Sequence, residues 1–122
     1  NLRVDGGAAA IRTLLSQSEM PTLVLCGNDL IAMGAMSELE EAGLRVPADV
    51  SVVGFDDIFF ASLARPPLTT VHIPRDRMGR VAFEALDKMM NLKSRRGKNY
   101  SIETALVVRK STAPPRKHDL RP

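Results

Sequence analysis

The sequence predicts an α/β fold in which helices flank a parallel sheet. Short apolar runs of the kind found in buried parallel strands alternate with segments whose apolar residues recur at helical spacing. The connections between these segments are short. A strand, a helix and a second strand follow one another within about 35 residues, which is the length of a βαβ unit, and such units are right-handed with parallel strands.

The chain opens with a predicted helix, which a predicted strand follows. Asp5 can cap the helix, and Ala8, Ile11 and Leu15 share one of its faces. Residues 22–26 then form a short continuous apolar run. Such a run is typical of a strand that is buried on both faces.

A second helix is predicted from the Gly-Asn-Asp turn of residues 27–29 to the residue before Gly43. Either Asn28 or Asp29 supplies its N-cap, because both side chains can accept a bond from the first turn. Gly43 is suited to the left-handed residue that ends such a helix. Residues 49–55 form the next predicted strand.

The rest of the chain continues the alternation. Residues 58–63 predict an apolar loop without a clear period, and residues 68–73 predict a third strand. Pro74 is suited to the start of a helix. A flexible link at residues 93–99 and an extended segment at residues 100–109 follow. The apolar stripe of that last helix consists of Met78, Ala82, Ala85 and Met89.

The composition is that of an ordinary globular chain. Its 122 residues are 44% apolar and 25% charged, which allows one domain of modest size or a piece of a larger one. Two further observations concern the location of the protein. No apolar run is long enough to span a membrane, and no secretory leader is visible. The single cysteine, Cys26, excludes a disulfide framework within the chain, so we expect a reducing, cytoplasmic compartment.

The positive charge is confined to the end of the chain. The net charge is +3 and the pI is about 9.4. Residues 1–92 nevertheless hold 8 basic and 12 acidic groups, whereas residues 93–122 hold 9 basic and 2 acidic groups. This distribution favours a solvated link at residues 93–99 and a basic disordered tail at residues 114–122. It argues against a folded surface that binds DNA phosphates.

Polar side chains follow two of the predicted strands at the point where each strand ends. Asn28-Asp29 comes after the first strand, and Asp56-Asp57 comes after the second. Ligands of open parallel sheets bind at that edge, so both pairs are expected to face one crevice. A purely structural interpretation stands beside this one, in which the first pair is only a helix cap and the second only a solvated turn.

An enzymatic interpretation has less support. Paired carboxylates such as Asp56-Asp57 hold Mg²⁺ in phosphoacceptor and phosphatase sites, but these sites need a nearby lysine and the core offers only Lys88. Cys26 and His72 could form a nucleophile pair, although a buried inert thiol and a strand histidine with a local hydrogen bond are the expected states. No catalytic motif or metal-ligand spacing is present. We therefore predict no enzymatic activity, no catalytic residue, no cofactor and no metal site.

The Phe59-Phe60 pair lies in a segment that should be exposed. Apolar residues in a polar setting often cover the edge of a core or meet a partner. We favour a contact between subunits, which Met33 and Met36, at i and i+3, could join. Core packing is the default interpretation of helix methionines such as these.

Four ordered segments resemble the LacI/GalR family of transcriptional regulators. Residues 21–35 (PTLVLCGNDLIAMGA) resemble the strand, turn and helix of that family, and residues 43–57 (GLRVPADVSVVGFDD) are a second, more specific match. Residues 66–71 (PPLTTV) with Met78-Gly79 follow at the family spacing, and residues 107–112 (VVRKST) resemble its terminal segment. The resemblance covers nearly the whole chain.

The resemblance implies a periplasmic-binding-protein-like domain with two lobes, of which this chain carries mostly the C-terminal lobe. Residues 1–73 would belong to that lobe, residues 74–104 would cross to the N-terminal lobe, and residues 105–113 would return. The family's DNA-binding helix-turn-helix head is not in this chain, so operator DNA would be bound only through that head. A homodimer is expected.

The family's effector residues carry over at two positions. Asn28 matches the cleft asparagine and Asp56 the cleft aspartate, and both bind hydroxyls or other polar groups of effectors in family members. Polyol recognition calls for a carboxylate that accepts bonds from two adjacent hydroxyls. Ile73 occupies a crossover position that is often polar in sugar-responsive members. The expected effector is a small polar molecule such as a sugar or a nucleoside. A periplasmic solute-binding protein of a transporter shares the fold and is the alternative.

Overall fold

The structure is a computed structural model that describes residues 2–17, 19–91 and 97–115. Helices and strands alternate along the chain, which confirms the predicted α/β fold. Two compact units can be distinguished: residues 1–72 with 106–122 form the first, and residues 73–105 form the second. The predicted flexible link and the predicted basic tail lie largely outside the described residues. None of the described helices is both long and apolar enough to cross a membrane.

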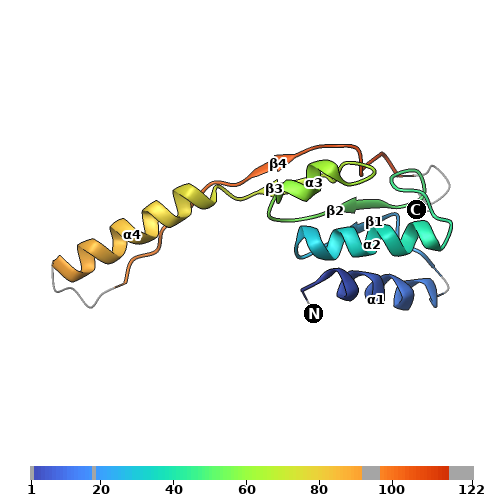
Figure 1. Ribbon diagram of the computed structural model, residues 1–122, viewed down its shortest axis with the longest axis horizontal. Helices are drawn as coiled ribbons and strands as arrows, with labels where there is room; N and C mark the ends of the chain where they lie inside the picture. Colours follow the sequence, from blue (N-terminus) through green and yellow to red (C-terminus); the bar gives the residue numbers. More distant parts are fainter. Residues whose placement is uncertain (1, 18, 92–96, 116–122) are drawn as a thin grey trace, which may run out of the picture. The chain divides into compact units, whose positions relative to one another are not determined.

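Helices α1 (Val4–Leu15) and α2 (Asp29–Glu41) lie side by side in the first unit (Figure 1). Their close approach requires two glycines. A Cβ at Gly34 would overlap the carbonyl oxygen of Val4, and a Cβ at Gly7 would overlap the carbonyl oxygen of Ile31. The backbones of the two helices therefore touch where any side chain would hold them apart.

Helix α1 begins before Asp5, so the prediction that Asp5 caps it is wrong. Arg3 holds the N-cap position without a capping bond from its side chain. Asp5 is the second helical residue, where its carboxylate still faces the positive end of the helix. The buried face also differs from the predicted one, because Leu14 packs against the core and Leu15 is 38% exposed.

Helix α2 follows the prediction closely. Asn28 is its N-cap, and Gly43, at a φ of 78°, provides the left-handed residue that ends it. The Gly43 N–H donates to the Glu40 carbonyl and the Leu44 N–H to the Leu39 carbonyl, each at 2.9 Å. These two bonds define a Schellman motif, in agreement with the left-handed stop predicted at Gly43.

Strands β1 (Leu23–Leu25) and β2 (Ser51–Val53) pair in parallel, which confirms the βαβ unit. The prediction that β1 is buried on both faces is wrong, because Leu23 and Leu25 are 52% and 73% exposed. Side chains alternate along a strand, so Val24 packs against the core while its two neighbours face the side that the described residues leave open.

Strand β3 (Thr70–His72) pairs with β4 (Ala105–Val107), and isolated parallel bridges join it to the end of β2. Both strands are shorter than the predicted extended segments. Serine and threonine hydroxyls hold the chain that follows β4. The Ser111 hydroxyl donates to the Val52 carbonyl at 2.6 Å and accepts from the Thr69 N–H at 2.8 Å.

Two further helices complete the fold. Residues predicted as a loop form the short helix α3 (Phe59–Leu63), because five residues are too few to show a helical period. Helix α4 (Arg75–Asn91) follows Pro74 as predicted. Its apolar stripe is not buried within the second unit, where Met78 is 48% and Met89 is 37% exposed.

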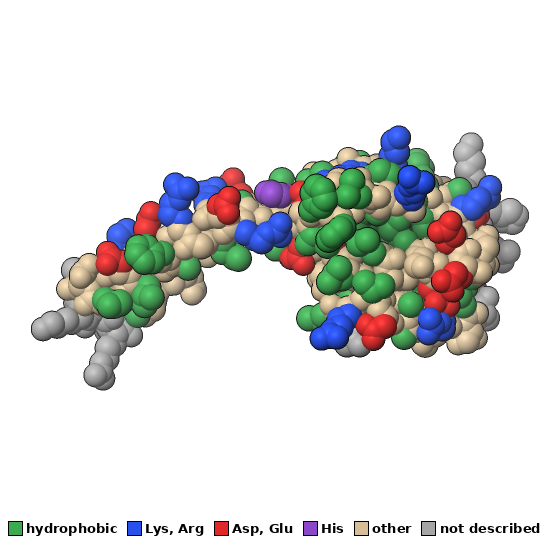
Figure 2. Space-filling model, in the orientation of Figure 1, with side chains coloured by type: hydrophobic (Ala, Val, Ile, Leu, Met, Phe, Trp, Pro, Cys, Tyr) green, Lys and Arg blue, Asp and Glu red, His purple; other side chains and the backbone are tan. Residues whose placement is uncertain are grey.

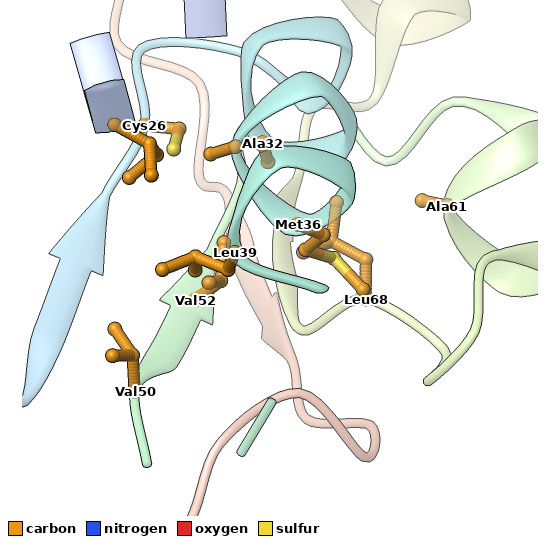
Figure 3. Close-up of a cluster of buried hydrophobic side chains, with 10 residues drawn as sticks. Cys26, Ala32, Met36, Leu39, Val50, Val52, Ala61 and Leu68 are labelled. Atoms are coloured by element: carbon orange, nitrogen blue, oxygen red, sulfur yellow. The ribbon is translucent and has the colours of Figure 1, made fainter. Parts of the chain in front are cut away.

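The core of the first unit lies between α2 and the strands, as Figure 3 shows. Helix α2 contributes Ala32, Ala35, Met36 and Leu39, and the strands and loops contribute Cys26, Val50, Val52 and Leu68. Burial of each Leu or Val side chain stabilises the fold by about 1.5–3 kcal/mol. This core fixes the carboxyl ends of β1 and β2, where the polar pairs begin.

Replacing Gly34 by Ala should destabilise the first unit by about 1–3 kcal/mol or more, because the added Cβ meets the backbone of α1 rather than a movable side chain. Urea unfolding followed by circular dichroism measures this. Gly79→Ala in α4 is the matched control, since nothing lies within 4 Å of its Cβ. That variant should not lower stability, because Ala favours a helix by about 0.5–1 kcal/mol over Gly. Equal stability of wild type and Gly34→Ala would contradict the close helix contact.

Candidate functional site

The predicted polar pairs lie at the carboxyl ends of β1 and β2, and backbone bonds hold these ends together. The Cys26 N–H donates to the Val53 carbonyl, and the Asp29 N–H donates to the Phe55 carbonyl, both at 2.8 Å. The segment that carries Asn28 therefore runs beside the segment that leads to Asp56. The structure brings the two predicted pairs to one edge of the sheet, as expected for parallel neighbours.

Asn28 acts as a helix cap in this structure. Its Oδ1 accepts the Ile31 N–H at 2.8 Å, and its Nδ2 donates to the Leu2 carbonyl at 3.2 Å. Asn28 is therefore one of the two N-cap residues that the sequence allowed. Its predicted contact with an effector stays a prediction.

Asp29 is fully buried and joins three parts of the first unit. Its Oδ1 accepts the Thr70 hydroxyl at 2.5 Å, and its Oδ2 accepts the Ile58 N–H at 2.8 Å. A Cβ at Gly54 would overlap Oδ1, so glycine makes room for the carboxylate. Asp29 was expected to be a possible cap or, with Asn28, to face the crevice at the end of the strands. The Val-Gly-Phe pattern ahead of Asp56 and the Thr69-Thr70 pair at the start of β3 are the signals that could have indicated this buried link.

Asp56 and Asp57 both adopt left-handed backbone conformations, with φ values of 110° and 51°. Such conformations cost about 1–3 kcal/mol each in residues other than glycine and persist only where neighbouring contacts enforce them. The Asp56 N–H donates to the Val71 carbonyl at 3.0 Å. Both side chains are partly buried. This turn is therefore held in place, in contrast to the solvated turn of the structural interpretation.

The Asp57 carboxylate bonds two basic side chains from other parts of the first unit. Its Oδ1 accepts Arg109 Nη2 at 2.7 Å, and its Oδ2 lies 3.0 Å from His72 Nδ1. Arg109 also donates through Nη1 to the Leu68 carbonyl at 2.8 Å. Partial burial by itself raises the pKa of Asp57, but the bonds and charges of Arg109 and His72 outweigh it, so this pKa lies below its ordinary value. Because an ionised carboxylate only accepts, His72 Nδ1 carries the proton of this bond.

The Cys26–His72 pair that was weighed as a nucleophile is not formed. His72 Nδ1 bonds Asp57, as expected for a strand histidine with a local partner. Burial, with a smaller contribution from the charge of Asp29, raises the pKa of the Cys26 thiol to about 11. A buried thiol with this pKa is protonated near neutral pH and is a poor nucleophile.

The Asp56-Asp57 pair is equally unsuited to a magnesium site. The Arg109 guanidinium lies at Asp57 Oδ1 and supplies the positive charge that a cation would otherwise bring. Among the described residues no group of three or more His, Cys, Asp or Glu side chains could hold a metal ion.

Two surface hollows of the first unit do not include Asn28 or Asp56 in their lining. A cavity of about 630 Å³ runs between α1 and α2, and one of about 330 Å³ lies near the end of α2. The first is lined by Arg3, Val4, Asp5, Ala8, Arg12, Leu30, Gly34, Ser37, Glu38 and Glu41. The second is lined by Met36, Glu40, Gly43, Leu44, Arg45, Val46, Arg65 and Pro66. Neither holds the predicted site residues, which lie at an open edge of the first unit.

Apolar side chains gather on the surface of the first unit around α3 (Figure 2). Phe59, Phe60 and Leu63 are 74%, 57% and 59% exposed. The two phenylalanine rings meet edge to face with centroids 5.8 Å apart. We name these three residues the α3 patch. Met33, which was expected to contribute to such a surface, is only partly exposed.

The depressed pKa of Asp57 predicts how stability depends on pH. A carboxylate whose folded-state pKa lies below the unfolded value stabilises the fold above the unfolded value of about 3.9, and this contribution is lost as pH falls through the folded value. Asp57→Asn should therefore lower stability at pH 7 by about 1–2 kcal/mol and flatten the loss of stability below pH ~4.

Urea unfolding between pH 2.5 and 7 checks this prediction. Asp87→Asn, on the exposed surface of α4, is the control and should stay within about 0.5 kcal/mol of wild type at pH 7. An Asp57→Asn variant that is as stable as wild type at pH 7 would show that the bonds of Asp57 contribute nothing.

Comparisons of the sequence and of the structure with known proteins lead to the same family. Residues 2–112 match the model of the periplasmic binding protein-like domain. The chain is 44% identical over 110 residues to the HTH-type transcriptional repressor PurR of Salmonella typhi, a match that covers 89% of this chain and 32% of the repressor. The chain thus spans about a third of the length of the curated relatives that it matches.

Solved structures agree with this match. A transcriptional regulator CelR–cellobiose complex is 37% identical with a TM-score of 0.84, over 89% of this chain and 33% of that one. The Lac repressor dimer bound to operator and the anti-inducer ONPF is 35% identical with a TM-score of 0.84, over 90% of this chain and 38% of that one. The chain therefore belongs to the periplasmic-binding-protein-like domain family and is part of a LacI-type effector-binding domain.

Proposed function

We propose that this chain is the effector-sensing part of a LacI-type transcriptional regulator without enzymatic activity. In the intact protein it binds a small polar molecule between two lobes and thereby controls operator binding by a helix-turn-helix head. The observation that carries this proposal is the Asp56-Asp57 turn, which is held in left-handed conformation at the carboxyl end of β2. The regulator acts on DNA and is therefore expected in the cytoplasm.

Asn28 and Asp56 are the proposed effector-binding residues. Both lie at the edge where ligands of parallel sheets bind. A carboxylate accepts hydrogen bonds from two adjacent hydroxyls, whereas the amide of Asn28 offers both a donor and an acceptor. Sugars and nucleosides carry such hydroxyls. The complex of a similar regulator with cellobiose supports this ligand class.

Competing functions have less support. A magnesium-dependent phosphoacceptor or phosphatase would need free oxygens on Asp57, and Arg109 and His72 bond them. A periplasmic solute-binding protein shares the fold, but the curated relatives are repressors. Neither alternative explains the match to regulators over most of the chain.

The α3 patch is the proposed contact between two copies of the regulator. Exposed aromatic and aliphatic side chains of this kind are enriched in the cores of homodimer interfaces. The Lac repressor structure that resembles this chain is a dimer. DNA is bound by the head alone in this proposal, because the acidic residues outnumber the basic ones over residues 1–92.

Asp56→Asn should weaken effector binding by the intact regulator about ten- to hundredfold. The change keeps the shape of the side chain but removes the charge-assisted bonds to two hydroxyls, which corresponds to about 1.5–3 kcal/mol. Calorimetry against a panel of sugars and nucleosides that includes cellobiose and adenosine measures the affinity. Asp49→Asn is the matched control, because Asp49 precedes the same strand and so lies at its opposite end. Equal affinities of Asp56→Asn and wild type would contradict the proposed site.

Phe60→Asp should weaken self-association of the intact regulator, because it places a charge in the centre of the α3 patch. Sedimentation velocity should show dimers or larger species for wild type and mostly monomers for the variant at micromolar concentration. Phe60→Leu keeps an apolar side chain and should keep the assembly. If both variants sediment like wild type, the contact lies elsewhere.

A further inference from the structure

The Asp57 cluster, which consists of Asp57, His72 and Arg109, lies beside both points where the chain passes between the two units. His72 is the last residue of the first unit before the chain leaves it. The chain returns to the first unit at residue 106, and Arg109 follows three residues later. All three side chains belong to the first unit. One carboxylate thus connects the departing strand, the returning strand and the turn that carries Asp56.

The backbone of this turn depends on bonds to the same strands. The Asp56 N–H donates to the Val71 carbonyl at 3.0 Å, one residue before His72. The Asp57 N–H lies 3.4 Å from the Thr70 hydroxyl, which is a long contact. The bonds of the Asp57 side chain to Arg109 and His72 are shorter, at 2.7 and 3.0 Å, and the bond to Arg109 joins two charged groups. They are the contacts best able to hold two successive left-handed residues.

Arg109 is itself fixed from several directions. Its guanidinium donates through Nη1 to the Leu68 carbonyl, and its backbone N–H donates to the Thr69 hydroxyl at 2.9 Å. Only 20% of its side chain is exposed. It therefore offers Asp57 a donor that is already in place, at little cost in side-chain entropy.

We propose that Asp57, clamped by Arg109 and His72, is the positioning residue of the effector site. It holds the neighbouring Asp56 in the conformation that meets the effector, and it ties this conformation to the two strands through which the chain crosses between units. Asp57 makes no contact with the effector in this proposal. This inference rests on the proposed function only for the role of Asp56. The bonds of Asp57 to Arg109 and His72 hold the turn whether or not an effector binds there.

Hydrogen exchange of the intact regulator without ligand tests the clamp. Arg109→Gln should speed exchange of the Asp56 and Asp57 amides about tenfold or more beyond any change in the amides of α2, because the α2 rates report the general loss of stability and the excess reports local opening of the turn. Arg109→Lys keeps the charge and should restore part of the protection. Arg45→Gln is the control, since it breaks the exposed Arg45–Asp49 pair elsewhere in the first unit. Asp57→Asn provides a second variant should Arg109→Gln fail to fold.

The outcomes separate the clamp from a general contribution to stability. Exchange that rises more at the turn than in α2, with partial rescue by lysine, supports the proposal. Unchanged exchange at Asp56 and Asp57 overturns it, and so does an equal increase throughout the first unit. In either case the proposed function stands, because no effector is involved in the measurement.

Affinity for cellobiose and adenosine, measured on the same variants, tests the link to the effector. A wild-type regulator that binds either probe should bind it at least about tenfold more tightly than Arg109→Gln, with Arg45→Gln unchanged. Equal affinity of Arg109→Gln and wild type overturns the positioning role. If Asp56→Asn also binds like wild type, the proposed site fails as well, even where the exchange data support the clamp.

Discussion

The buried hydrogen bond between Asp29 and Thr70 is the constraint on which the rest of the first unit depends. A carboxylate that is fully removed from water must have its oxygens bonded, and here one oxygen takes the Thr70 hydroxyl and the other the Ile58 N–H. These bonds join the start of α2 to β3 and to the residue ahead of α3. The space for the carboxylate exists only because residue 54 is glycine. The path of the chain from β2 into the Asp56-Asp57 turn follows from this single buried group.

The acidic residues at this edge of the sheet have different tasks because their surroundings differ. Asp29 is fully buried and serves the fold. Asp57 is partly buried; it forms an ion pair with Arg109 and a hydrogen bond with His72. Asp56, the proposed effector-binding residue, lies next to it and is also partly buried. The Thr70 hydroxyl donates to Asp29 and lies 3.4 Å from the Asp57 N–H, so one side chain connects the buried carboxylate to the clamped one.

Local patterns predicted most of the first unit, and long-range contacts account for the errors at the Asp57 cluster and β1. The N-cap at Asn28, the stop at Gly43 and the parallel pairing of β1 with β2 depend on neighbours in the sequence and were predicted correctly. The Asp57 cluster was missed because its members are 15 and 52 residues apart, a separation that no local period reveals. The burial of β1 was misjudged for a related reason, since an apolar run does not show what covers each of its faces.

A site that senses a ligand needs a charge that is accessible and yet held still, and these requirements conflict. Water screens an accessible carboxylate and its side chain rotates freely, whereas burial fixes a carboxylate and removes it from the ligand. In the proposed site these two requirements fall on adjacent residues. Asp57 makes the bonds to Arg109 and His72 that hold the turn, and Asp56 is left as the carboxylate proposed to meet the effector. His72 is the last residue before the chain leaves the first unit and Arg109 follows soon after its return, so the proposed clamp links the turn to the chain at both crossings.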